Sequence, residues 1–87
     1  MAAAQDITLK VGEEAKLRGA FAGGWWIIYS GMPNKDTYSV AIRWTSGNNA
    51  ASHTLFLPAG QAEFAAAKGH VRVYSVSSHE IRLRFTK

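Results

Sequence analysis

The sequence predicts an all-β fold, a small antiparallel β-sandwich of about seven strands. Apolar and polar residues alternate with a period of two in several short runs, as they do in strands that bury one face. Glycine, proline, asparagine and serine separate these runs, at intervals that suit turns. A small closed β-barrel is the alternative fold.

The 87 residues suffice for a single domain, residues 1–87, without a linker or an internal repeat. Aliphatic and aromatic residues make up 47% of the chain and charged residues 18%, which is not the composition of a disordered protein. The absence of cysteine excludes disulfide scaffolds, thiolate metal sites and thiol catalysis. Residues 1–5 are expected to form a disordered tail.

The N-terminal residues leave the location of the protein open. Ala2, Ala3 and Ala4 resemble the small residues that precede a signal-peptidase cleavage site. A processed signal would give an exported or periplasmic protein, and otherwise the protein would be cytoplasmic. No apolar run approaches the roughly 20 residues that cross a bilayer, so membrane insertion is not expected.

The first two strands follow from clean alternation. Residues 7–11 place apolar side chains on one face and polar side chains on the other. Residues 15–21 alternate again, and Lys16 and Arg18 are expected to point outward. Residues 23–24 are both glycine and end the second strand.

Three further strands are expected before residue 60. Residues 25–29 are apolar on both faces, which indicates a central strand or a strand with exposed aromatic side chains. Residues 30–36 are predicted to be a loop in which Gly31 could adopt positive φ. Residues 38–44 alternate cleanly, and after a turn the strand at 53–57 ends before proline.

A short helix is predicted over residues 61–68, as a cap on one end of the sheets. Four alanines favour helix, Lys68 suits its C-terminal end, and Gly69 suits the position just beyond. Phe64 is the only large apolar side chain available to anchor it. An irregular strand containing Phe64 is the competing interpretation.

The last hairpin allows its register to be derived. A two-residue turn at Ser77–Ser78 would pair Val73 with Arg82 and mix apolar and charged side chains on one face. A three-residue loop at residues 77–79 pairs Val73 with Leu83 and is therefore preferred. The same register gives four further cross-strand pairs: Val71 with Phe85, Arg72 with Arg84, Tyr74 with Arg82 and Ser75 with Ile81.

Residues 7–17, with the sequence ITLKVGEEAKL, resemble the opening strands of bacterial immunoglobulin-like modules. In those modules an alternating strand, a V-G-E turn and a second strand lead to a strand that bears tryptophan. The resemblance implies an immunoglobulin-like β-sandwich that serves as an adhesive or accessory binding module, with no active site to carry over. No cysteine pair accompanies it, and it does not extend beyond Trp25.

The chain offers little for catalysis or metal binding. The three histidines, His53, His70 and His79, fall on different strands or in a turn, without the spacing of a metal site. No serine or threonine lies in a nucleophile elbow. We therefore expect no enzyme activity, no metal and no cofactor.

The final hairpin is expected to carry a basic face. Arg72, Arg82 and Arg84 project to the same side, together with Tyr74. Arg72 opposite Arg84 is a like-charge pair, which is unfavourable unless a negative charge neutralises it. Glu63, Glu80 or an external anion could supply that charge. A solvated strand whose charges protect an edge is the alternative interpretation.

Trp25 and Trp26 must point to opposite faces of their strand, because the side-chain period is two. If Trp25 and Ile27 face the core, then Trp26 and Ile28 face outward. An exposed tryptophan is typical of a protein interface, whereas the structural alternative is that both rings are packed.

Together these features predict a non-enzymatic binding or assembly module that recognises a protein partner or a second copy of itself. The partner could present an acidic surface or a glycan. The expected binding residues lie on an aromatic and arginine-bearing sheet face: Trp26, Ile28, Arg72, Tyr74, Arg82 and Arg84. The alternative is a small β-barrel that binds single-stranded nucleic acid, although a net charge of +4 is moderate for that class.

Overall fold

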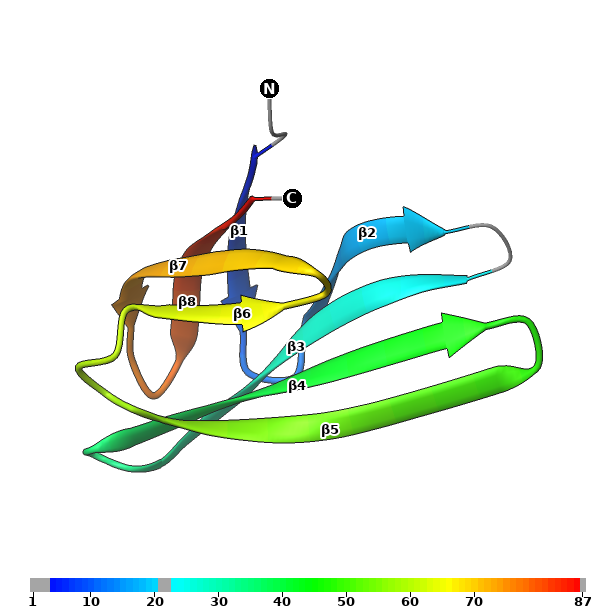
Figure 1. Ribbon diagram of the computed structural model, residues 1–87. Coiled ribbons are helices and arrows are strands. Elements are labelled where there is room, and N and C mark those ends of the chain that lie inside the picture. The colour runs from blue at the N-terminus through cyan, green and yellow to red at the C-terminus, as the bar shows by residue number, and fades with distance from the viewer. Residues whose placement is uncertain (1–3, 21–22, 87) are drawn as a thin grey trace.

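A computed structural model describes residues 4–20 and 23–86, which form eight strands in two antiparallel sheets (Figure 1). Sheet I has the order β1-β8-β7-β6, and sheet II has the order β2-β3-β4-β5. The strands are β1 (Ala4–Lys10), β2 (Glu14–Ala20), β3 (Gly23–Asn34), β4 (Thr37–Ser46), β5 (Asn49–Pro58), β6 (Glu63–Ala66), β7 (Gly69–Val76) and β8 (Glu80–Thr86). The all-β prediction is confirmed.

The two sheets do not close into a barrel, so the alternative fold is not observed. Consecutive strands β1 and β2 lie in different sheets, as do β5 and β6. At these two places the chain passes from one sheet to the other, and no strand of one sheet pairs with a strand of the other. Within sheet II the strands follow one another in sequence order, whereas immunoglobulin domains connect their two sheets by Greek-key crossings.

The core lies between the sheets and is built from the alternation that the sequence shows. Ile7 and Leu9 of β1 are buried, while the polar residues between and beside them are exposed. The same alternation buries one face of each central strand: Ile27, Tyr29, Tyr38, Val40, Ile42, Val71, Val73, Ile81, Leu83 and Phe85. The outward-facing side chains of both sheets are thereby left to form two separate surfaces.

Two buried tyrosines link sheet II to loops of sheet I. The Tyr29 hydroxyl of β3 donates a hydrogen bond to the carbonyl oxygen of Ser77, in the β7–β8 loop. The Tyr38 hydroxyl of β4 donates to the carbonyl oxygen of Gln61, in the β5–β6 loop, at 2.6 Å. Burial raises the pKa of both hydroxyls above the ordinary value of 10.0, and for Tyr38 the nearby Tyr29 adds to the effect.

The raised pKa values of Tyr29 and Tyr38 predict a loss of stability at alkaline pH. The unfolded chain releases these protons above about pH 10, while the folded chain retains them. The free energy of unfolding should therefore be unaffected by these groups below pH 10 and should fall as the pH rises beyond it. Urea unfolding across this range should show a shallower fall for Tyr29→Phe/Tyr38→Phe than for the wild type.

The single variants Tyr29→Phe and Tyr38→Phe serve as controls for each other, and each should remove part of the alkaline loss of stability. An alkaline profile of Tyr29→Phe/Tyr38→Phe that overlays the wild-type profile would contradict the assignment.

The predicted helix over residues 61–68 is wrong, and the competing strand is correct. Residues Glu63–Ala66 form β6, which pairs with β7 so that Phe64 lies opposite Val71. Burying Phe64 in the common core outweighs the helix preference of the alanines, as tertiary packing often does. This strand raises the number of strands from the predicted seven to eight.

Ala67 and Lys68 close the β6–β7 hairpin with φ values of 53° and 60°, as in the two-residue turns that suit hairpins. The Arg18 guanidinium donates hydrogen bonds to the carbonyl oxygens of Ala67, at 3.0 Å, and Lys68, at 3.3 Å. The pairing of β2 with β3 shifts register between Lys16 and Arg18. Because of this bulge, Arg18 bridges the two sheets instead of pointing outward as predicted.

The predictions for the N-terminal tail and for the loop at residues 30–36 also differ from the structure. Ala4 and Gln5, assigned to a disordered tail, pair with Thr86 and Phe85 as part of β1, and residues 1–3 lie outside the described residues. Most of residues 30–36, predicted to be a loop, instead extends β3. Gly31 has a φ of 94° and sits at a register shift in the β3–β4 pairing, so the predicted positive φ is confirmed.

Candidate functional site

The outer side of sheet I carries the basic surface that the sequence predicts. Arg72 and Tyr74 lie on β7, and Arg82 and Arg84 lie on β8. All four side chains are exposed, and the residues that alternate with the three arginines are buried in the core. These four residues are called the arginine face below.

The predicted register of β7 and β8 holds over half of the hairpin. Val73 lies opposite Leu83, and Arg72 lies opposite Arg84. Beyond Val73 the register shifts, so that Ser75 rather than Tyr74 lies opposite Arg82. A bulge of this kind re-aims a side chain, and here the Arg84 guanidinium carbon lies 5.8 Å from the centre of the Tyr74 ring.

Asp6 of β1 neutralises Arg84, in place of Glu63, Glu80 or the external anion that the sequence suggests. The Arg84 Nε donates to Asp6 Oδ1 at 2.8 Å, and Nη2 donates to Oδ2 at 3.2 Å. This two-point contact is the strong geometry for arginine and carboxylate. The hydrogen bond from Arg84 lowers the pKa of Asp6, and the same contact raises the pKa of Arg84.

Of the two glutamates expected to neutralise the arginines, Glu80 is the register partner of Lys10, and Glu63 lies beside a histidine. Glu63 Oε1 lies 3.6 Å from His70 Nε2, although Glu63 is also the register partner of Arg72. Among the residues that the structure describes, neither Arg72 nor Arg82 has a carboxylate oxygen within 4.0 Å of its guanidinium. Arg72 and Arg82 are therefore available to form an ion pair with a negatively charged group of a ligand.

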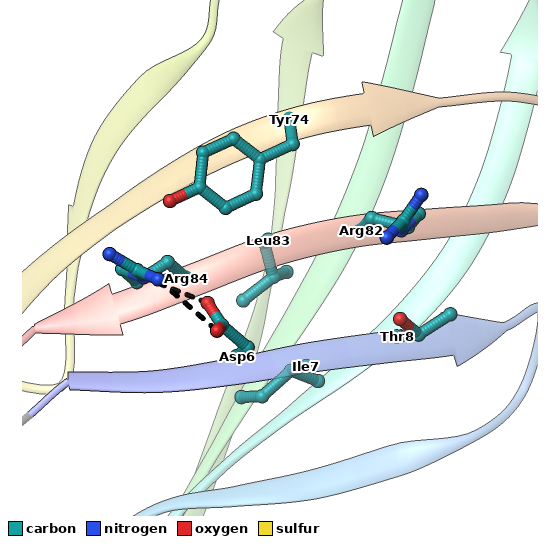
Figure 2. A pocket seen from close by; sticks show the side chains of 7 residues that line it. All are labelled: Asp6, Ile7, Thr8, Tyr74, Arg82, Leu83 and Arg84. Atoms are coloured by element: carbon teal, nitrogen blue, oxygen red, sulfur yellow. Dashed lines mark hydrogen bonds and ion pairs between the residues drawn. The ribbon is translucent and has the colours of Figure 1, made fainter.

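A shallow hollow of about 210 Å³ lies on the arginine face. Figure 2 shows Tyr74 on one side of it and Asp6 and Thr8 of β1 on the other, with Arg82 and Arg84 between the two strands. Ile7 and Leu83 complete the lining. The hollow thus offers a guanidinium that is not engaged by a carboxylate among the described residues, Arg82, beside the hydroxyl of its register partner Thr8, which can donate a hydrogen bond. The Tyr74 hydroxyl lies toward Arg84, at the other end of the hollow (Figure 2).

Trp26 and Ile28 lie on the opposite side of the sandwich, on the outer side of sheet II. Both are half-buried, because the side chains beside them cover the surface. The Arg43 guanidinium carbon lies 4.4 Å from the centre of the Trp26 ring, and Lys16 Nζ lies 5.5 Å from it. Cations over an indole ring are attracted to its electron-rich face, so the chain itself occupies much of this aromatic surface.

The structure therefore does not bring the six predicted binding residues together. Arg43 is held over Trp26 partly by an ion pair with Glu14, at 3.1 Å. The most exposed aromatic side chain on this side is Phe56 of β5, at 66%, which is not among the six predicted binding residues. The signal in the sequence is that Phe56 alternates with Leu55 and Leu57 and therefore shares the outward face of the strand with Ser52 and Thr54.

The remaining chemistry of the described residues is limited. No group of three or more histidine, aspartate or glutamate side chains within residues 4–20 and 23–86 could hold a metal ion. In the same part of the chain, no helix has the length and apolar character needed to span a bilayer. Comparison with models of known families, with curated proteins and with solved structures finds no match to this chain.

Proposed function

We propose that the protein is a non-enzymatic binding module whose arginine face recognises an acidic segment of a protein partner. The observation that carries this proposal is the hollow beside Tyr74, where Arg82 has no carboxylate within 4.0 Å among the described residues. An aspartate or glutamate side chain placed there would meet the Arg82 guanidinium and the hydroxyl of Thr8, which is the register partner of Arg82 on β1.

The composition of the arginine face also supports a protein ligand. Tyrosine and arginine are enriched in protein interfaces, where tyrosine adds apolar contact area at small entropic cost. Tyr74 is 54% exposed, and Arg84 is already held in place by Asp6. A surface that is partly ordered before binding loses less side-chain entropy when the partner arrives.

The absence of enzyme activity is part of the same proposal. The carboxylate of the hollow, Asp6, is engaged by Arg84 and is held ionised by it, which suits neither a general acid nor a free base. Trp26 and Ile28 are assigned no part in binding the acidic segment.

Charge reversal on the arginine face tests the proposal. Arg72→Glu/Arg82→Glu should weaken binding to an oligo-glutamate peptide by at least about tenfold, because attraction is replaced by repulsion at the contact. Binding of the wild type should also weaken as salt is added. Fluorescence anisotropy with the labelled peptide measures both effects, and oligo-glutamine serves as the uncharged probe.

Lys16→Glu/Lys35→Glu is the matched control, since it changes the net charge equally but away from the arginine face. Lys16 lies over Trp26 on sheet II, and Lys35 lies in the β3–β4 turn. This variant should keep most of the affinity. Equal losses in both double variants, or a wild type that binds oligothymidylate but not oligo-glutamate, would contradict the proposal, and the latter would favour nucleic acid as the ligand.

A further inference from the structure

Strand β5 forms an edge of sheet II that lacks the features by which proteins protect sheet edges. It pairs with β4 on one side, and its other side faces no strand among the described residues. Its ten residues, Asn49–Pro58, span about 33 Å. Proteins usually block such edges with charged residues, internal proline or short strands, yet β5 contains no Lys, Arg, Asp or Glu, and its one proline is the last residue.

The other edge strands differ from β5 in this respect. The edge strand β1 carries Asp6 and Lys10, and the edge strand β2 carries Glu14, Lys16 and Arg18. The edge strand β6 has only four residues. Strand β5 is therefore the one edge among the described strands that is both long and free of formal charge.

The N-terminal half of β5 is exposed on both of its faces. Every residue from 49 to 54 is exposed, including those on the side that faces sheet I. In Figure 1 the β4–β5 hairpin, drawn in green, extends well past β6 and β7. A second strand could therefore lie along this edge, with its own side chains above and below the sheet.

We propose that β5 pairs with β5 of a second copy of this chain, in antiparallel orientation, about a two-fold axis at His53. This arrangement pairs Ala51 with Leu55 of the second copy and Ala50 with Phe56 of the second copy. Leu55 and Phe56 then each lie opposite an alanine, on the same face of the joined sheet, and Leu57 lies opposite Asn49. The pairing would cover Phe56, which is 66% exposed in the single chain.

The sequence favours this register over the two neighbouring registers that keep the faces aligned. An axis at Ser52 would pair only residues 49–55 of the strand and leave Phe56 outside it. Shifting the axis to Thr54 would bring Pro58 into the paired segment, and proline has no backbone N–H for the ladder. The axis at His53 uses residues 49–57 and leaves Pro58 outside. A one-residue slip between the strands would instead mix the two faces of the sheet.

A lysine at the axis should separate the two copies. His53→Lys would place two like charges directly opposite each other, which is unfavourable, and should raise the dimer dissociation constant at least tenfold. Sedimentation velocity over a concentration series measures this, and circular dichroism verifies that the exposed substitution leaves the sheets intact. Ala65→Lys, on the exposed side of β6, is the control and should leave the dimer unchanged.

A cysteine at the axis tests the register itself, since the chain has no native cysteine. Opposite residues in antiparallel strands have Cα atoms about 4.5–5.5 Å apart, within the range of about 4.4–6.8 Å that a disulfide needs. His53→Cys should form covalent dimers on mild oxidation far faster than His79→Cys, at the exposed loop histidine.

Three results would overturn this proposal. They are a wild type that stays monomeric at the highest soluble concentration, a dimer that His53→Lys leaves intact, and open-ended assembly rather than a closed dimer. The arginine-face variant Arg72→Glu/Arg82→Glu should dimerise normally, so the outcome is independent of the acidic ligand.

Discussion

Phe85→Ala is expected to reduce the free energy of unfolding by about 3–5 kcal/mol, because it removes a large side chain from the centre of the core. Phe85 is 1% exposed and lies on β8, opposite Val71 of β7. The truncation loses the transfer free energy of the ring and leaves a cavity that rigid neighbouring strands cannot fill. Urea unfolding followed by circular dichroism measures the change.

Phe56→Ala is the control of identical chemistry. Phe56 is 66% exposed, so its truncation should change the free energy of unfolding of the dilute monomer by no more than about 0.5 kcal/mol. A domain of this size has a small margin of stability, and Phe85→Ala could unfold entirely. Phe85→Leu should then give a folded protein with a smaller loss. Equal effects at positions 85 and 56 would contradict the observed core.

Gly69→Ala is expected to cost about 1–3 kcal/mol or more, because β7 begins where there is no room for a side chain. An added Cβ at this position would lie 2.6 Å from Phe85 Cζ and 2.6 Å from the backbone oxygen of Thr86. The Thr86 oxygen belongs to the paired strand β8 and cannot move without disturbing the sheet. Differential scanning calorimetry should show a lower midpoint for the variant.

Gly60→Ala is the matched control, because the added methyl group at this position would contact no other residue. A Cβ at Gly60 would have no heavy atom within 4 Å, and alanine restricts the unfolded chain more than glycine does. This variant should be neutral or more stable by about 0.4–1 kcal/mol. A Gly69→Ala protein as stable as Gly60→Ala would show that the close approach of β7 and Phe85 is wrong.

The strands could be predicted because one face of each is buried and side-chain alternation records which face. The pairing of Val73 with Leu83 and of Val71 with Phe85 follows from keeping apolar residues on one side, and the structure shows both pairs. The β6 segment could not be predicted in this way. Its four residues are too short for alternation to be visible, and its alanines favour helix until Phe64 is buried by its neighbours.

The residues of the candidate site are brought together by strands that are distant in the sequence, and local sequence patterns do not show which strands pair. Asp6 reaches Arg84 because β1 lies beside β8, although the two residues are 78 positions apart in the chain. The bulge that moves Tyr74 away from its predicted place opposite Arg82 leaves no local signature in the sequence. The assignment of Trp26 and the arginines to opposite sides required knowing that β3 and β8 lie in different sheets.

The most direct test of the proposed function is the location at which an acidic peptide binds. Amide chemical shifts recorded by NMR during titration with oligo-glutamate should change at Thr8, Tyr74, Arg82 and Arg84. Those of Trp26, Ile28 and Arg43, across the sandwich, should stay constant. Shifts that concentrate on sheet II, or an absence of shifts at low salt, would contradict the proposal that the arginine face binds an acidic segment.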